Sequence, residues 1–399
     1  MAVNTSFPAR QQVDRVQRIS LIVGVVGLVL AILGSFFAGG GLDRFFESYL
    51  LAYLFWVGFA LGSFALVMIQ HLAGGTWGAI VRRPLEAAMA TLPVMALLFI
   101  PILIGIPNLY VWSGSEEMIV EAVGEELAVF VLDKTFYLNT PFFIIRSILY
   151  FAIWIGLAFL LYRWSEEQDR TANPALVSRF RALSGVGLVT FVMTMTFAAV
   201  DWGMSLEPEF WSSIYGVILM IGQGLSAFAF LILFFRFFGN QEPFADIVTP
   251  KRIHDIGKFT LGFVILWTYV NMSQFIIIWS ANLPEETPWY IRRGEVGWDV
   301  LAVILVLFHF VVPFFILLSR RLKRNIVPLS IVAVGILVMR MVDLFWLIIP
   351  AFHQDGIYFN VVYLFAPIGI GGIWLASFLW MLKRKPLLPL NDPRLEAAH

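Results

Sequence analysis

The feature that most constrains this chain is a series of long apolar segments separated by short polar ones. An α-helix needs about 20 mostly apolar residues to cross the hydrocarbon of a bilayer. The segments of that kind are Ile19–Phe37, Ser48–Ile69, Leu85–Ile104, Thr140–Tyr162, Ser184–Asp201, Trp211–Phe237, Gly257–Trp279, Trp298–Ser319, Ile326–Ile349 and Val361–Leu382. The sequence therefore predicts an all-α integral membrane protein with ten transmembrane helices.

Composition agrees with this prediction. Hydrophobic residues make up 60% of the 399 positions and charged residues only 14%, about half the usual share of charge in a soluble domain. The first apolar run follows Arg10, Arg15 and Arg18, and it is longer than the core of a signal peptide, which predicts a retained helix. The net charge is zero, so nothing favours a nucleic-acid partner.

The lysines and arginines predict the orientation. Most of the 27 lysines and arginines fall in segments that lie on the same side of the membrane as the N-terminus. Because cytoplasmic segments carry an excess of these residues, that side is predicted to be the cytoplasm. We therefore predict that both ends lie inside. The outer segments are acidic instead, above all Ser113–Asp133, in which Leu127–Leu132 is too short to span and predicts a surface helix. This acidic segment is either a solvated loop or a docking face for extrinsic subunits.

Six polar side chains inside the predicted spans are candidate site residues, because a charge at the centre of a bilayer costs roughly 2.5–3.5 kcal/mol on insertion scales. Five of them fall in the outer halves of their spans, and the histidine falls near the middle of the eighth. The six residues are Arg146, Asp201, Gln274, His309, Arg340 and Asp343.

Each candidate also has a purely structural interpretation. Arg340 and Asp343 are three residues apart, so they share one helix face and can form a neutralised pair. The side chain of Gln274 could form a hydrogen bond between helices, and His309 could be a buried core residue. The functional hypothesis is that Asp201, Asp343 and His309 exchange protons in a wet cavity, while Arg146 and Arg340 hold the carboxylates ionisable.

The residues that the chain lacks narrow the function. It has no cysteine, which removes thiolate ligands for iron–sulfur clusters, and a b-type haem needs paired axial ligands at depth. Of the five histidines, only His309 lies deep in a span. We therefore predict no metal, no redox cofactor held by this chain and no catalytic residue. Two classes remain: a secondary transporter or proton channel, and the membrane anchor of a respiratory complex that handles quinone and protons.

Several motifs resemble a known family. They are FWVGFALGSFALVMIQHLAGGTWG at 55–78, RRPLEA at 82–87, YLNTPFFIIR at 137–146, DWGMSLEPEFWSSIY at 201–215 and NLPEETPWYIRR at 282–293. Together they resemble the NrfD/polysulfide-reductase-like membrane subunits, most closely the second, ActF-type quinone-binding subunit of alternative complex III, a quinol:cytochrome c oxidoreductase. The resemblance runs from about Arg18 to Leu382.

The resemblance implies two antiparallel four-helix bundles, spans two to five and six to nine, with spans one and ten peripheral. The corresponding divisions of the chain are 1–47, 48–203, 204–349 and 350–399. It implies that a quinone binds in a cavity in the outer half of the membrane. Arg146 and Asp201 are carried over from the motifs above, and Gln274 from SQFIIIWSA at 273–281, which precedes the last of them.

The resemblance also implies a setting for the chain. The chain is expected to belong to a complex in the bacterial inner membrane. Its expected partners are a homologous membrane subunit, an iron–sulfur protein, c-type haem proteins and lipids. The expected function is that of a non-redox subunit, not catalytic alone, which supports quinol oxidation and proton transfer.

Overall fold

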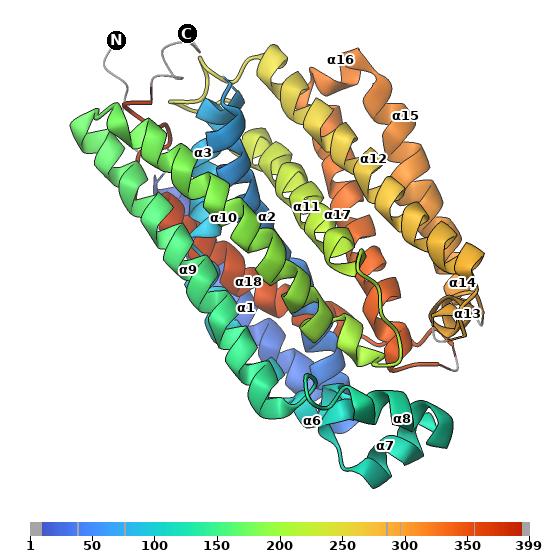
Figure 1. The fold of residues 1–399 in the computed structure, drawn as a ribbon. Coiled ribbons are helices and arrows are strands. Elements are labelled where there is room, and N and C mark those ends of the chain that lie inside the picture. Colours follow the sequence, from blue (N-terminus) through green and yellow to red (C-terminus); the bar gives the residue numbers. More distant parts are fainter. Residues whose placement is uncertain are drawn as a thin grey trace.

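A computed structural model describes residues 10–37, 40–75, 77–284, 286–295, 297–354 and 356–392 of the protein (Figure 1). It is 82% helical and contains no strand within these ranges. Ten of its helical segments are long and apolar enough to cross a membrane. The predicted all-α class and the ten spans are thus confirmed.

The elements follow one another in this order: α1 Arg10–Phe37, α2 Gly41–Ala73, α3 Trp77–Met89, α4 Leu92–Leu98, α5 Ile100–Ile104, α6 Ile106–Leu109, η1 Val111–Ser113, α7 Glu116–Val123, α8 Glu125–Asp133, α9 Thr140–Thr171, α10 Ala175–Trp202, η2 Met204–Leu206, α11 Tyr215–Phe238, α12 Pro250–Ala281, α13 Thr287–Arg293, α14 Trp298–Leu305, η3 Val306–Val311, α15 Val312–Leu318, α16 Arg320–Lys323, α17 Ile326–Ile348, η4 Ile349–Ala351 and α18 Val362–Leu382.

Two of the ten spans are interrupted within their length rather than only near one end. The third is divided into α3, α4 and α5, and Pro93 and Pro101 each stand in the first turn after a break. Proline has no N–H to donate, so it is tolerated where a helix begins and disrupts one that continues. The eighth span contains a π-helical turn, η3, between α14 and α15. The sequence predicted single helices at both places.

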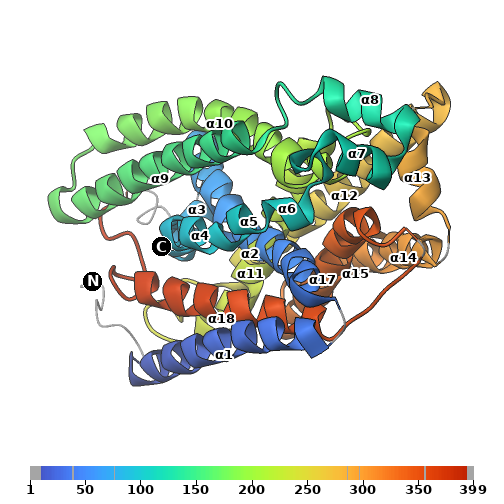
Figure 2. The ribbon, with the colours of Figure 1, turned by 90° about the horizontal axis from the view of Figure 1, so that it is seen from below.

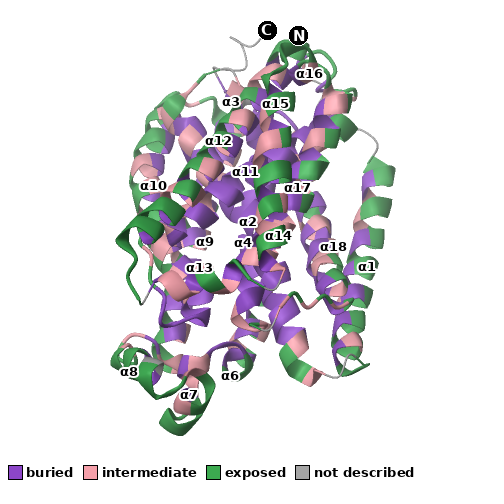
Figure 3. Ribbon diagram, turned by 90° about the vertical axis from the view of Figure 1, so that its right-hand side faces the viewer, coloured by how far each residue is buried: buried purple, intermediate pink, exposed green. Residues whose placement is uncertain are grey.

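The helices α2 and α11 form the centre of the molecule. In an 18-residue apolar stretch of each helix, 89% of the residues of α2 and 78% of those of α11 are buried. The buried residues run through the middle of the helix assembly (Figure 3). Close approach is possible because Gly62 of α2 faces the backbone of Gln223 on α11, where an added Cβ would come within 2.2 Å of the carbonyl oxygen. Small residues have this role at many membrane helix interfaces.

The two helices predicted to be peripheral, α1 and α18, pack against each other. α1 and α18 pack backbone to backbone through glycines, and a Cβ on Gly372 would lie 2.5 Å from the Cα of Gly24. α18 is the more buried of the two, with 61% of an 18-residue apolar stretch buried against 28% for α1. Figure 2 shows α18 between α1 and the central helices. The further division into two four-helix bundles stays a prediction.

The two ends of the described chain meet on one side. Lys383, which follows α18, contacts Asp14 and donates to Gln17 over 2.5 Å, both near the start of α1. The acidic segment lies at the opposite end of the molecule as the hairpin of α7 and α8 (Figure 1), with Glu126 exposed on it. The predicted short helix at Leu127–Leu132 is confirmed as part of α8.

The predicted orientation can be tested by cysteine labelling, since the native chain has no cysteine. We expect Glu121→Cys, exposed on α7, to react with a membrane-impermeant maleimide in sealed right-side-out vesicles. Arg321→Cys, exposed on α16, should react only after the vesicles are permeabilised. Labelling in the reverse order would contradict the prediction that both ends face the cytoplasm.

Candidate functional site

The first two candidate residues form one buried ion pair between α9 and α10. The Nε and Nη2 atoms of Arg146 donate to the two carboxylate oxygens of Asp201 over 2.9 and 2.8 Å. The hydroxyl of Tyr150, one turn along α9, donates to the same carboxylate over 2.8 Å. Both carboxylate oxygens of Asp201 are therefore bonded, and its side chain is fully buried.

Aromatic rings enclose this pair. The guanidinium carbon of Arg146 lies 3.8 Å from the ring centre of Tyr137 and 4.3 Å from that of Phe142. Its remaining Nη1 donates to the carbonyl oxygen of Tyr137 over 2.8 Å. Cation–π contacts of this kind stabilise a desolvated arginine. The arrangement is a closed, neutral clamp that joins α9 to α10.

The second ion pair lies on α17, as the spacing predicted. Arg340 contacts Asp343 through Nη1, and both side chains are about 3% exposed. The indole N–H of Trp267, on α12, donates to the same carboxylate over 3.1 Å. Room for the guanidinium comes from Gly222 of α11, where an added Cβ would lie 2.1 Å from the Arg340 Cζ. A glycine at that position allows this arginine to lie against the neighbouring backbone.

His309 lies in the π-helical turn η3 and is fully buried. Its ring meets that of Trp267 edge to face, with 4.3 Å between the ring centres. Neither ring nitrogen has a hydrogen-bond partner within the described residues. Trp267 therefore contacts both His309 and Asp343, although no motif singled it out. Single π-helical turns occur often at functional sites.

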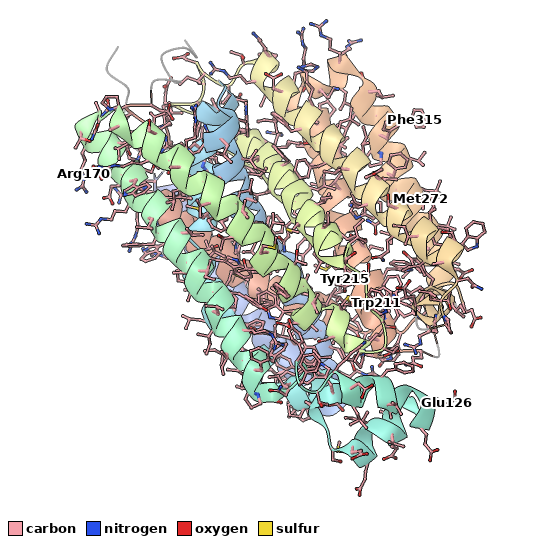
Figure 4. All side chains as sticks on the ribbon, in the orientation of Figure 1. Glu126, Arg170, Trp211, Tyr215, Met272 and Phe315 are labelled. Carbon is pink, nitrogen blue, oxygen red and sulfur yellow. The ribbon has the colours of Figure 1, made fainter. Side chains whose placement is uncertain are left out.

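A pocket of about 410 Å³ opens beside this group, between α12, α13, α14, η3 and α17. Most of its lining is apolar, and its polar side chains include Asp343, Arg293 and Asn271. Met272 of α12, labelled in Figure 4, belongs to the lining and is 51% exposed, so the pocket reaches the lipid-facing surface of the helix. The lining consists of Trp267, Thr268, Asn271, Met272, Phe275, Tyr290, Arg293, Gly294, Asp299, Ala302, Leu305, Val306, Phe310, Asp343 and Trp346.

Gln274 supports the wall of this pocket but does not line it. Its Oε1 accepts from Ser212 over 2.8 Å, and its Nε2 donates to the hydroxyl of Tyr290 over 3.2 Å. It joins α12 to the loop before α11 and to α13, as the structural interpretation predicts. One face of α12 carries Trp267, Asn271 and Gln274 at helical spacing. This spacing is the feature of the sequence from which a place for Trp267 in the site could have been predicted.

Arg293 lies between the predicted spans Gly257–Trp279 and Trp298–Ser319, and thus in a predicted outer loop, but the structure places it in the core at the end of α13, 1% exposed. Its Nη2 contacts Glu207 over 2.5 Å and donates to the carbonyl oxygen of Leu347 over 2.9 Å. The carbonyls of the last turn of a helix lack intrahelical partners. Arg293 therefore ties the end of α17, and with it Asp343, to the loop that follows α10.

A second missed cluster lies at the opposite end, around Arg82 and Arg83 of α3. Glu86 accepts from both, from Arg82 over 2.7 Å and from Arg83 over 2.7 Å. The segment after α18 folds back onto this cluster, and Asp392 accepts from Arg82 over 2.8 Å. The spacing of Arg82 and Arg83 to Glu86 was a local signal for these pairs, but their burial depends on the returning tail.

Lys385 belongs to the same tail. Its ammonium donates to the carbonyl oxygen of Tyr162 over 2.6 Å and lies 3.3 Å from the centre of that ring. Burial lowers the pKa of Lys385 from its ordinary 10.5 to about 8, and the carboxylate of Glu86 opposes this shift only in part. The folded chain thus releases this proton at a lower pH than the unfolded chain.

Arg146→Gln should destabilise the protein by about 3–5 kcal/mol, because it leaves the Asp201 carboxylate buried without a counter-ion. The double variant Arg146→Gln/Asp201→Asn should recover much of that loss, since two neutral amides replace the two charges. The measurement is the free energy of unfolding in detergent micelles. Arg170→Gln is the matched control on the same helix, because its pair with Glu166 is exposed and is worth at most about 1 kcal/mol. Equal losses for Arg146→Gln and Arg170→Gln would contradict the assignment.

The shifted pKa of Lys385 predicts a pH dependence. Between about pH 8 and 10.5 the unfolded chain binds the Lys385 proton and the folded chain does not, so the contribution of this residue to the free energy of unfolding rises with pH in that window. Unfolding midpoints of the native protein should rise across this range relative to those of Lys385→Met. A parallel response of the two proteins would show that Lys385 titrates normally.

Comparison with models of known protein families and with characterised proteins finds no match to this chain. The family resemblance therefore stays a prediction that depends on the motifs. The structure places these motifs at the elements just described: RRPLEA in α3, the end of YLNTPFFIIR at Arg146, and DWGMSLEP from Asp201 into the loop that Arg293 holds.

Proposed function

We propose that this chain is a non-redox membrane subunit of a bacterial quinol:cytochrome c oxidoreductase of the alternative complex III type, which holds a quinone and accepts its protons. The observation that carries the proposal is the pocket of about 410 Å³ with the ionisable carboxylate of Asp343 in its wall. An intramembrane carboxylate beside a cavity is by default a functional-site hypothesis. In this proposal, electrons pass to partner subunits that carry haem c and iron–sulfur clusters.

The lining of the pocket fits the chemistry of a quinol. Its volume lies within the roughly 300–1,000 Å³ that is common for small-molecule sites. The apolar side chains suit a ring and an isoprenoid tail, and exposed lining residues such as Met272 and Val306 give access from the lipid. The carboxylate of Asp343 provides an acceptor for a quinol hydroxyl, and the side-chain amide of Asn271 provides a donor for a ring oxygen.

The residues around Asp343 suit it to proton transfer. Arg340 stabilises the ionised carboxylate, and the Trp267 N–H fixes its orientation. A carboxylate held in this way can accept a proton from a hydroxyl in the pocket. His309 contacts the same indole and has two unbonded ring nitrogens within the described residues, so it is the next titratable group on a route away from the pocket.

The two ion pairs differ in their suitability for this role. Both carboxylate oxygens of Asp201 are occupied by Arg146 and Tyr150. Protonation of Asp201 would have to break these hydrogen bonds, each of which is charge-assisted and strong. We therefore assign proton exchange to Asp343 and His309, and assign the Arg146–Asp201 pair to holding α9 against α10.

Asp343→Asn should reduce quinol oxidation by the purified complex at least about tenfold, which corresponds to 1.4 kcal/mol, because the proton acceptor is lost. Ala302→Trp should abolish binding of a radiolabelled quinone, because Ala302 lines the pocket and the indole would fill it. Asp246→Asn is the matched control, since Asp246 is exposed on the loop after α11. Unchanged turnover and unchanged quinone binding in both pocket variants would contradict the proposal.

The alternative function is a stand-alone secondary transporter or proton channel. Two measurements distinguish these functions: the protein composition of the purified material, and transport by the isolated chain. The respiratory subunit should co-purify in mild detergent with haem-containing and iron–sulfur proteins. A transporter should instead take up solute or protons when the chain alone is reconstituted in vesicles.

A further inference from the structure

A second cavity lies on the inner side of the pocket at Asp343 and shares no lining residue with it. It has a volume of about 520 Å³ and is walled by α1, α2, α11, α17 and α18, near the end of the molecule where α1 begins and α18 ends. This end is rich in arginine, and we predict that it faces the cytoplasm. The lining consists of Gln12, Val13, Val16, Phe55, Trp56, Phe59, Phe230, Leu233, Phe234, Phe237, Phe238, Gln241, Leu337, Trp374, Leu375, Phe378 and Leu379. We refer to this cavity as the aromatic groove.

The inner wall of the aromatic groove is preformed. The ring centres of Trp56 and Phe59 are 5.0 Å apart, and Trp374 lies 5.1 Å from Phe59 and 5.6 Å from Phe378. Aromatic contacts at these distances add to the stability of a packed cluster. The wall therefore keeps its shape without a ligand, and it presents almost entirely carbon to the cavity.

The groove is long and lies along the membrane normal. Its lining on α11 extends from Phe230 to Phe238, about 12 Å along the helix axis at roughly 1.5 Å per residue. That is most of the thickness of one leaflet, which is half of the roughly 30 Å hydrocarbon thickness. An extended alkyl chain matches such a shape, whereas a compact solute would leave most of the wall exposed.

The polar groups of the groove are confined to its mouth. Gln12 and Gln241 are the polar lining residues apart from the two tryptophans. The Nε2 of Gln241 donates to the carbonyl oxygen of Phe237 over 3.1 Å, which leaves Oε1 buried with no partner within the described residues. A ligand with a hydroxyl or ammonium group at this level would supply the missing donor.

Three arginines neighbour residues of the same mouth in the sequence, as do the acidic Asp14, which pairs with Lys383, and Glu242. Arg10 and Arg15 flank Gln12 on α1, and Arg236 precedes Phe237 on α11. All three side chains are exposed. Basic pockets between helices on the cytoplasmic side bind anionic phospholipid headgroups. The charge therefore favours a lipid with an anionic headgroup over a neutral one.

We propose that the aromatic groove is a specific site for one anionic phospholipid of the arginine-rich leaflet. One acyl chain lies along the wall formed by Trp56, Phe59 and Trp374. The phosphate lies among Arg10, Arg15 and Arg236, and a headgroup hydroxyl donates to Gln241. The bound lipid fills the space between the α1–α18 pair and the central helices.

The proposal can be tested on the unmodified full-length protein with a phosphatidylglycerol that carries a diazirine in its acyl chain. After photolysis in nanodiscs, we expect labelled peptides from the groove faces of α1, α11 and α18. Excess unlabelled phosphatidylglycerol should suppress the labelling, and equal phosphatidylcholine should suppress it at least about tenfold less, a difference of 1.4 kcal/mol. Labelling spread evenly over lipid-facing helices, or equal competition by the two lipids, would overturn the proposal.

Two variants separate the parts of the site. Leu233→Trp/Leu375→Trp fills the groove and should remove the retained phospholipid seen by native mass spectrometry. Arg236→Gln should reduce the preference for phosphatidylglycerol and leave the groove open. Ile331→Trp and Arg320→Gln are the controls, since Ile331 is 70% exposed on α17 and Arg320 is exposed on α16. Retention of the lipid by the filled variant, or release of a quinone in place of a phospholipid, would refute the assignment.

Discussion

The requirement that every charge inside the bilayer meet an opposite charge organises this protein. An unpaired charge at depth costs several kcal/mol, so each buried arginine or carboxylate binds a partner before it can serve any other purpose. Arg146 meets Asp201, Arg340 meets Asp343, and Arg293 meets Glu207. Because these pairs also hold backbone carbonyls and neighbouring rings, they fix how α9, α10, α13 and α17 lie against one another.

Local spacing in the sequence was enough to predict part of this arrangement of helices and ion pairs. The ten apolar runs predicted the ten spans, since a bilayer of fixed thickness imposes a minimum length on each. The separation of three residues predicted the contact of Arg340 with Asp343, because it places both on one helix face. Helix ends were less predictable: α9 and α12 continue beyond the hydrocarbon-length segments that hydropathy detects, because a helix need not end where the lipid does.

Contacts between distant segments could not be predicted in this way. Arg146 and Asp201 are 55 residues apart, and Arg82 reaches Asp392 across 310 residues, so no local periodicity relates them. Trp267 was missed because its part in the site comes from two neighbours on other helices, His309 and Asp343. Arg293 was assigned to a loop because nothing in its own segment records that the end of α17 covers it.

The two intramembrane pairs then differ in what surrounds them, and this difference carries the functional assignment. The Arg146–Asp201 pair is enclosed by Tyr137, Phe142 and Tyr150, and both oxygens of the carboxylate are already hydrogen-bonded. The carboxylate of Asp343 faces a pocket, and Gly222 provides the space in which its arginine lies. In the proposed function, the same chemistry serves as a structural clamp where aromatic rings close over it. Where one side is left open, it would serve as a site for proton exchange, because a carboxylate can take up a proton only from a group that can reach it.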